Sequence, residues 1–151
     1  MAVKPIPEGY HTITPYLVVP NAAKLIEFLT RAFGAVEVMR MPDPSGRIMH
    51  AEVRLGDSML MCADASERYP AMTGLYHLYV PDADAAYRSA LEAGARSERE
   101  PTTEFYGDRV AQVRDLSGCI WYMATHVEDV SGEEIERRFH AMSKEKQSGA
   151  A

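Results

Sequence analysis

The sequence contains two similar stretches, AEVRLGDSMLMCA at residues 51–63 and AQVRDLSGCIWYMA at residues 111–124. Each stretch begins with Ala, Glu or Gln, Val and Arg, continues through a short Gly-containing turn, and ends in an apolar run that closes on Ala. Two strand-like runs on either side of such a turn are typical of a β-hairpin. The sequence therefore predicts the same hairpin twice, which indicates an internal duplication.

The segments that precede the two hairpins are also repeated. In each half, a run rich in β-branched and aromatic residues leads to a Pro-Asn or Pro-Asp step, and apolar residues at helical spacing follow, up to Gly34 and Gly94. Each half therefore reads as strand, helix and three strands. We assign module one to residues 10–64 and module two to residues 74–126, and we place both in a single domain of residues 1–130.

A further helix is predicted after the second module. Ser131 is followed three residues later by Glu134, which is the signature of a capping box at a helix N-terminus. The pattern predicts a C-terminal helix over residues 131–146. The last residues, 147–151 (QSGAA), are expected to form a disordered tail.

Charge and hydropathy exclude several classes of partner. The formal net charge is -6 and no Lys/Arg stripe is present, so we expect no nucleic-acid partner. No apolar run approaches the roughly 20 residues that span a bilayer, so we expect no membrane partner. The first residues, MAVKPIPEGYHT, lack the apolar core of a signal peptide, which favours a cytoplasmic protein. Cys62 and Cys119 lie in apolar runs without a neighbouring Cys and are expected to be buried thiols.

Several phrases of the sequence resemble a known family. They are TPYLVV at 14–19, MHAEVRLGDSMLM at 49–61, YGDRVAQVRDLSG at 106–118 and THVEDVSGEE at 125–134. With the duplication, they make the chain similar to the vicinal oxygen chelate superfamily, in its glyoxalase/bleomycin-resistance (PhnB-like) branch. The resemblance implies an α+β fold in which two tandem βαβββ modules form a cup-shaped mixed sheet with the helices outside. It also implies a homodimer.

The resemblance also indicates where a metal site would lie. Metal-dependent members of the superfamily bind a divalent ion through one His, Glu or Gln from each of four strands. The corresponding positions in this chain are Thr14, Met61, Leu75 and Tyr122. These side chains lack the imidazole and carboxylate donors that such ions prefer. We therefore expect no metal at the usual positions and no cofactor.

A relocated divalent metal is one alternative, with His50, Glu52 and His77 as the candidate ligands. Strand alternation directs Met49 toward the helix, so that His50 and Glu52 point into the cup, and Gln112 is the duplicate of Glu52. A carboxylate in a partly apolar cup has its pKa raised by desolvation, which makes Glu52 a candidate base. The structural alternative is a salt bridge from Glu52 to Arg54, Arg109 or Arg114.

The cup is expected to bind a small molecule through side chains on the inner faces of both modules. The candidates are Tyr16, His50, Glu52, Met59, Met61, His77, Tyr79, Tyr106, Arg109, Gln112 and Tyr122. Met and aromatic side chains suit an irregular apolar ligand, and they also fill ordinary cores. Arg109 is read either as an anchor for an acidic ligand or as a partner of Asp108.

Three functions remain open from the sequence. The first is a metal-free protein that binds a small, partly apolar molecule, in the manner of bleomycin-resistance proteins. The second is a metal-dependent lyase, isomerase or dioxygenase of the same superfamily with a relocated metal site. The third is a structural or regulatory dimer whose cup is filled by its own side chains. The sequence does not indicate which reaction, if any, is catalysed.

Overall fold

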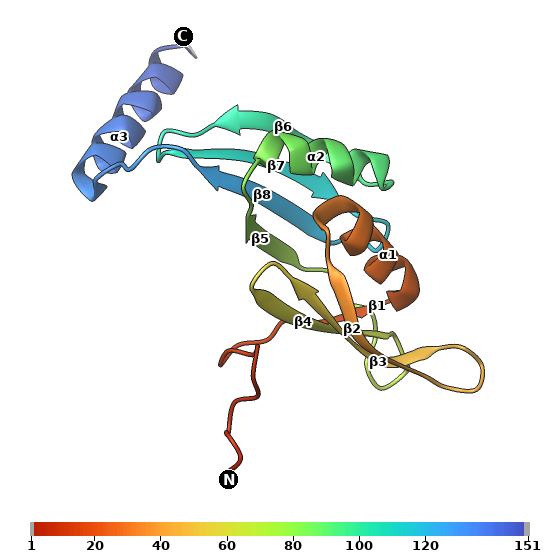
Figure 1. Ribbon diagram of the computed structural model, residues 1–151. Coiled ribbons are helices and arrows are strands. Elements are labelled where there is room, and N and C mark those ends of the chain that lie inside the picture. Colours follow the sequence, from red (N-terminus) through yellow and green to blue (C-terminus); the bar gives the residue numbers. More distant parts are fainter. Residues whose placement is uncertain (1, 150–151) are drawn as a thin grey trace.

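The computed structural model describes residues 2–149 and contains the predicted order of elements twice (Figure 1). Module one consists of β1 (Tyr16–Val19), α1 (Ala22–Phe33), β2 (Val36–Pro42), β3 (Ile48–Leu55) and β4 (Ser58–Asp64). Module two consists of β5 (Leu75–Tyr79), α2 (Ala83–Glu92), β6 (Arg96–Thr103), β7 (Asp108–Arg114) and β8 (Ile120–His126). The helix α3 (Gly132–Ser148) follows.

The strands form two four-stranded sheets with the same topology, β1-β4-β3-β2 in module one and β5-β8-β7-β6 in module two. In each sheet the first strand pairs in parallel with the last, and the other pairs are antiparallel. The register is also duplicated: Tyr16 lies opposite Met61, and His77 lies opposite Tyr122. The predicted α+β fold of two βαβββ modules with a C-terminal helix is confirmed. Within the described part of the chain, no strand hydrogen bonds join the two sheets to each other.

The helix boundaries follow from the capping residues. The side chain of Asn21 accepts a hydrogen bond from the amide of Lys24, and α1 ends at Gly34, whose φ of 68° lies in the left-handed region. Asp82 caps α2 in the same way, through the amide of Ala85.

The C-terminal helix begins as predicted and runs further than predicted. The hydroxyl of Ser131 accepts from the amide of Glu134, so the capping residue is the expected one. The helix continues to Ser148, two residues past the expected end at 146, and Gly149 caps it. Residues 150–151 of the expected disordered tail lie outside the described residues.

A bulge in β3 changes which side chains face the core. Met41 pairs with His50 but Pro42 pairs with Ile48, so Met49 is the extra residue in β3. Ile48 is therefore 2% exposed in the core, and Met49, at 55% exposed, points to the opposite face. The prediction that Met49 faces the helix is wrong, because strict alternation ends at the bulge. Ala51 and Val53, beyond it, are buried as expected.

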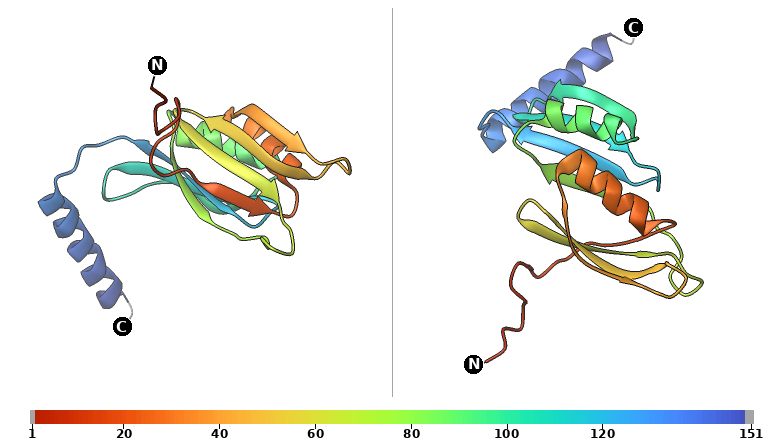
Figure 2. Two further views of the ribbon diagram at one scale, coloured as in Figure 1. Left: turned by 90° about the horizontal axis from the view of Figure 1, so that it is seen from below. Right: turned by 45° about the vertical axis from the view of Figure 1, so that its right-hand side comes forward.

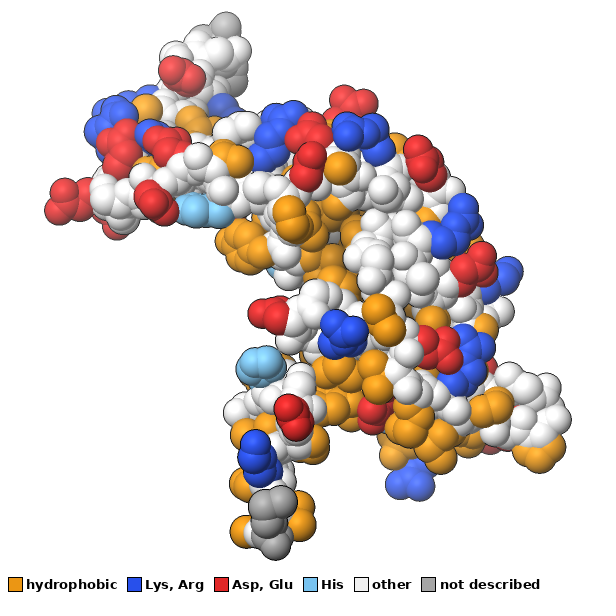
Figure 3. Space-filling view, viewed as in Figure 1, with side chains coloured by type: hydrophobic (Ala, Val, Ile, Leu, Met, Phe, Trp, Pro, Cys, Tyr) orange, Lys and Arg blue, Asp and Glu red, His pale blue; other side chains and the backbone are white. Residues whose placement is uncertain are grey.

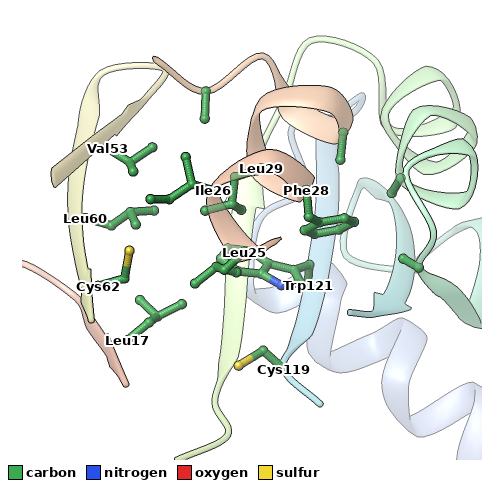
Figure 4. Packing of buried hydrophobic residues seen from close by; sticks show 14 of the residues in the cluster. Leu17, Leu25, Ile26, Phe28, Leu29, Val53, Leu60, Cys62, Cys119 and Trp121 are labelled. Carbon is green, nitrogen blue, oxygen red and sulfur yellow. The ribbon is translucent and has the colours of Figure 1, made fainter. Parts of the chain in front are cut away.

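One hydrophobic core is shared by both modules. Leu25, Ile26 and Leu29 of α1 pack on sheet one, while Phe28 on the same helix lies near Trp121 of β8, with ring centroids 6.5 Å apart (Figure 4). The helices α1 and α2 lie side by side over the faces that enclose this core (Figures 1 and 2). The opposite face of each sheet, which we call its open face, carries no helix of its own module.

The two cysteines are buried and form no disulfide, as predicted. Burial raises the pKa of the Cys62 thiol to about 11, so it packs as a small apolar side chain rather than as a reactive thiolate. Among residues 2–149, no helix is both long and apolar enough to cross a membrane.

Candidate functional site

A cleft of about 560 Å³ opens between the two modules, and we call it the intermodule cleft. Its lining residues are Pro15, Leu17, Leu55, Gly56, Asp57, Ser58, Met59, Leu60, Leu75, Tyr76, His77, Leu78, Tyr79 and Trp121. All of β5 therefore lines one wall, and the hairpin between β3 and β4 lines the other. The cleft is visible as the hollow on the left-hand side of the molecule in Figure 3. Its volume lies in the usual range for a small-molecule pocket.

Aromatic side chains dominate the module-two wall of the cleft. The ring of Tyr76 stacks on Trp121 with centroids 4.8 Å apart. His77 stacks on Tyr122 at 5.4 Å with the planes only 10° apart, and it also lies 5.0 Å from Tyr79. Because successive side chains of β5 point to opposite faces, the strand presents both sets of rings at this sheet edge. Of the predicted residues, the structure brings Met59, His77 and Tyr79 together in the cleft.

The open face of module one carries a chain of polar contacts. The Tyr16 hydroxyl lies 3.0 Å from Nδ1 of His50, and Nε2 of His50 lies 3.3 Å from Oε1 of Glu52. Met61 lies opposite both Tyr16 and Glu52 in the strand register, so it shares their face as predicted. These four candidates therefore form one cluster, on the face that strand alternation predicts.

The pKa of Glu52 moves in the direction opposite to the prediction. Polar contact with Tyr10 and the hydrogen bond with His50 lower the pKa of Glu52, and together they outweigh the desolvation that would raise it. Burial and the nearby Glu52 carboxylate raise the pKa of Tyr10 to about 12. The Tyr10 hydroxyl does not reach ordinary hydrogen-bond geometry with any partner in the described chain, so we treat its approach to Glu52 as a close polar contact. Glu52 is therefore an ionised acceptor rather than a base with a raised pKa.

The structural partner of Glu52 is not one of the three arginines that were predicted. Its ion-pair contact is with His50 and not with an arginine. Arg114 pairs with Glu98, and Arg109 pairs with Asp84 of α2 through two hydrogen bonds of 2.8 and 2.9 Å. Arg109 therefore points to the helix side of β7, and its expected place in the cup is wrong, as is its pairing with Asp108. The cause is alternation, because Asp108 and Arg109 are neighbours on one strand.

Asp108 instead anchors a second polar cluster, on the open face of module two. It is 4% exposed, and its Oδ2 accepts a hydrogen bond of 2.9 Å from the Tyr79 hydroxyl. Its Oδ1 lies 2.8 Å from Nδ1 of His126, while Nε2 of His126 lies 2.7 Å from Asp129. These contacts, first to Asp108 and then to Asp129, raise the pKa of His126. Four members of the two clusters were not predicted from the sequence: Asp108, His126, Asp129 and Tyr10.

Tyr106 and Gln112 complete the predicted set. Gln112 lies opposite Tyr122 in the register of β7 and β8, so both share one face of sheet two. Burial, followed by the nearby charge of Glu104, raises the pKa of Tyr106, which also lies close to Tyr122 and Asp108. The two residues belong to the open face of module two, and neither lines the intermodule cleft.

The side chains present do not fit the divalent metal that the superfamily resemblance implies. Tyr122 is stacked beneath His77, and Met61 and Leu75 supply no nitrogen or carboxylate donor. Within residues 2–149, no group of three or more His, Cys, Asp and Glu side chains could hold a metal ion. The trio of His50, Glu52 and His77 is therefore not brought together within residues 2–149: His50 and Glu52 lie on the sheet of module one, whereas His77 lies on the sheet of module two.

Comparisons with known proteins agree on the fold. The family model of the Glyoxalase/Bleomycin resistance protein/Dioxygenase superfamily matches residues 9–136. The uncharacterized protein Mb0911c of Mycobacterium bovis is 35% identical over 135 residues, which cover 82% of this chain and 89% of that protein. The uncharacterized protein Rv0887c of Mycobacterium tuberculosis is also 35% identical, over 82% of this chain and 79% of its own length.

Solved structures show the same architecture at lower identity. TioX from Micromonospora sp. ML1 superposes with a TM-score of 0.68 and 24% identity, covering 78% of this chain and 99% of that chain. Protein PA1353 from Pseudomonas aeruginosa gives a TM-score of 0.64 and 21% identity, again over 78% and 99%. At this level of identity the likeness concerns the fold alone.

Proposed function

The chain belongs to the Glyoxalase/Bleomycin resistance protein/Dioxygenase superfamily, and from that premise we propose that it binds a small, partly apolar molecule without the metal that many relatives use. The intermodule cleft is the proposed site. Binding alone, as in the bleomycin-resistance proteins that the family description names, is then sufficient for function by sequestration.

The observation that carries this proposal is the lining of the intermodule cleft. Leu75, Tyr76 and Leu78 supply apolar and aromatic surface, with Trp121 buried behind Tyr76, while His77 and the hairpin residues supply a few polar groups. Ligand pockets characteristically combine a mainly apolar wall with a small number of polar groups that orient the ligand. The volume of about 560 Å³ supports a binding role over a purely structural one.

The donor chemistry supports a mechanism that does not use a metal. The residues at the usual metal positions are apolar, aromatic or hydroxyl side chains, so we propose that ligand recognition depends on stacking and apolar contact. His77, with its ring against Tyr122, extends this aromatic surface and adds a hydrogen-bonding nitrogen. No reaction step is required of these residues.

We also propose a homodimer. Large apolar side chains are exposed on the open faces of both sheets, including Leu75 at 58% and Tyr79 at 68% in module two, and Met39 and Met41 in module one. Large apolar side chains that gather on one face of a sheet are typical of an interaction site. A second copy would cover it, and both copies would then contribute to an enclosed cup.

The proposal is tested by titration of the protein with N-phenyl-1-naphthylamine, a small neutral aromatic probe. Trp121 is the single tryptophan of the chain and is buried against Tyr76 at the cleft wall, so energy transfer from Trp121 to the bound naphthylamine reports binding near it. We expect saturable quenching that Leu75→Asp weakens about tenfold or more, because a carboxylate in an apolar wall is costly to desolvate.

The matched control is Leu116→Asp, which changes an exposed leucine in the turn between β7 and β8, outside the cleft. It should bind the naphthylamine like the unaltered protein. The proposal fails if binding does not saturate, or if the two substitutions have the same effect.

A further inference from the structure

A second cavity, of about 510 Å³, lies on the open face of module one, and we call it the linker pocket. The side chains that matter for its chemistry are Tyr16, Val18, Arg47, Met49, Tyr69 and Met72. It shares no lining residue with the intermodule cleft. The bulge in β3 helps to create it, because that bulge directs Met49 outward from the core.

The segment between the modules forms one wall of the linker pocket. Backbone hydrogen bonds hold it against β1: the amide of Ala65 donates to the carbonyl of Val19 at 2.8 Å, and the amide of Met72 donates to that of Val18 at 3.0 Å. A bond of 2.8 Å from the amide of Ser66 to the carbonyl of Tyr69 closes the turn between them. The segment is therefore a folded wall that presents Tyr69 and Met72, and not only a connection.

The pocket contains one cation whose charge is not neutralised by an ion pair. Among the described residues, the Arg47 guanidinium makes no ion pair, and its one hydrogen bond is to the carbonyl of Ala65, at 2.8 Å. Asp64 also lines the pocket, but its two oxygens accept hydrogen bonds from the amides of Ala22 and Ile48. After the hydrogen bond from Ser45, the charge of Arg47 also contributes to lowering the pKa of Asp43, but the Asp43 and Arg47 side chains form no ion pair. The Oδ1 of Asp43 accepts hydrogen bonds from the amides of Ser45 and Arg47.

We propose that the linker pocket binds a small amphipathic anion, an aromatic or branched aliphatic carboxylate or sulfonate. Its apolar part lies against Tyr16, Val18, Met49 and Met72, and its acid group lies on the Arg47 guanidinium. The guanidinium has five N–H donors and uses one of them here, so a planar or tetrahedral acid group can accept two hydrogen bonds from it. This site is additional to the proposed cleft and does not depend on it.

The probe that tests this proposal is 8-anilinonaphthalene-1-sulfonate, whose fluorescence rises in an apolar site. We expect saturable binding that Arg47→Gln weakens about tenfold or more, since a charge-assisted hydrogen bond is lost. Arg47→Lys should lose less, because it keeps the charge and loses only the fork of donors. The matched control is Arg54→Gln, an exposed arginine on β3 that lines neither cavity, and it should bind the sulfonate unchanged.

Two results would overturn the proposal. The first is equal binding of the sulfonate by Arg47→Gln and the unaltered protein, with both unfolding at the same temperature. The second is binding that Leu75→Asp weakens and Arg47→Gln does not, which would place the sulfonate in the intermodule cleft and leave the proposed function standing. The dissociation constant of neutral N-phenyl-1-naphthylamine, measured by quenching of Trp121 fluorescence, should be the same for Arg47→Gln and the unaltered protein. Failure at one site is therefore distinguishable from failure at the other.

Discussion

Glu52 and Asp108 are carboxylates on the open faces, and each is held by an imidazole and approached by a tyrosine. Glu52 lies beside His50 and Tyr10, and its pKa is lowered by these contacts. Asp108 is nearly buried, and it accepts from Tyr79 and contacts His126. Carboxylates held by such contacts serve as acceptors that orient the neighbouring rings. This favours a binding face over an acid–base site.

The contacts of His126 predict a specific pH dependence of stability. Because Asp108 and Asp129 raise the pKa of His126 above its unfolded value of about 6.5, the stabilisation is fully present below that pH and is lost as the pH rises through the folded pKa. The difference in thermal midpoint between the unaltered protein and His126→Gln should therefore be larger at about pH 5.5 than at about pH 8.5.

The control for His126 is His11→Gln, since His11 is exposed and precedes the first strand. Its difference from the unaltered protein should stay the same at both pH values. A His126→Gln difference that grows with pH would contradict the assigned contacts.

At the scale of elements, Gly107 fixes the connection between β6 and β7 against the chain that leads to α3. Its φ is 99°, and its carbonyl accepts from the amides of Val127 and Glu128. A Cβ at this position would collide with the carbonyl oxygen of Glu128. Gly107 therefore combines a left-handed backbone with a close approach between two backbone segments.

Gly46 provides a matched comparison, because its φ of 90° is similar and a Cβ there would meet open space. We expect Gly46→Ala to lower the free energy of unfolding by about 1 kcal/mol, the usual cost of a left-handed non-glycine residue. Gly107→Ala should cost at least about 2 kcal/mol more, because of the steric collision. Chemical denaturation of both variants measures the difference, and equal losses would show that the segment around Glu128 moves away freely.

The elements are also the scale at which sequence reasoning succeeded most fully. Repeated hairpins, capping residues and helical spacing are local signals, so they identified both modules and the caps at Asn21 and Ser131. The bulge at Met49 was not predictable, because strand periodicity carries no mark of one inserted residue. The Tyr79–Asp108–His126 cluster was missed because its members come from three different strands.

At the scale of the whole molecule, the placement of one module on the other creates the intermodule cleft. That placement depends on α1 packing against sheet one on one side and Trp121 on the other, as Figure 4 shows. The pattern inside each module does not encode this contact. The sequence therefore predicted Met59, His77 and Tyr79 as separate binding residues, but it did not predict the intermodule cleft that they line together.

The exposed open faces predict self-association. We expect light scattering after size exclusion to give twice the mass of one chain, because a second copy covers apolar side chains such as Met39 and Met41. Met41→Glu should shift the protein toward the monomer by placing a charge in that contact. Leu116→Glu, in the turn between β7 and β8, is the control and should remain dimeric. A monomer at all concentrations for the unaltered protein would refute the dimer.

The central claim, metal-independent binding of a small apolar molecule in the intermodule cleft, is tested most directly by one titration under two conditions. N-phenyl-1-naphthylamine is titrated against protein dialysed with a chelator and against protein supplied with Zn²⁺, Ni²⁺ or Mn²⁺, with Trp121 fluorescence as the readout. The account predicts the same dissociation constant in both conditions, because the residues of the cleft wall do not include three or more His, Cys, Asp or Glu side chains that could hold a metal ion. Binding that appears only with the metal would contradict it.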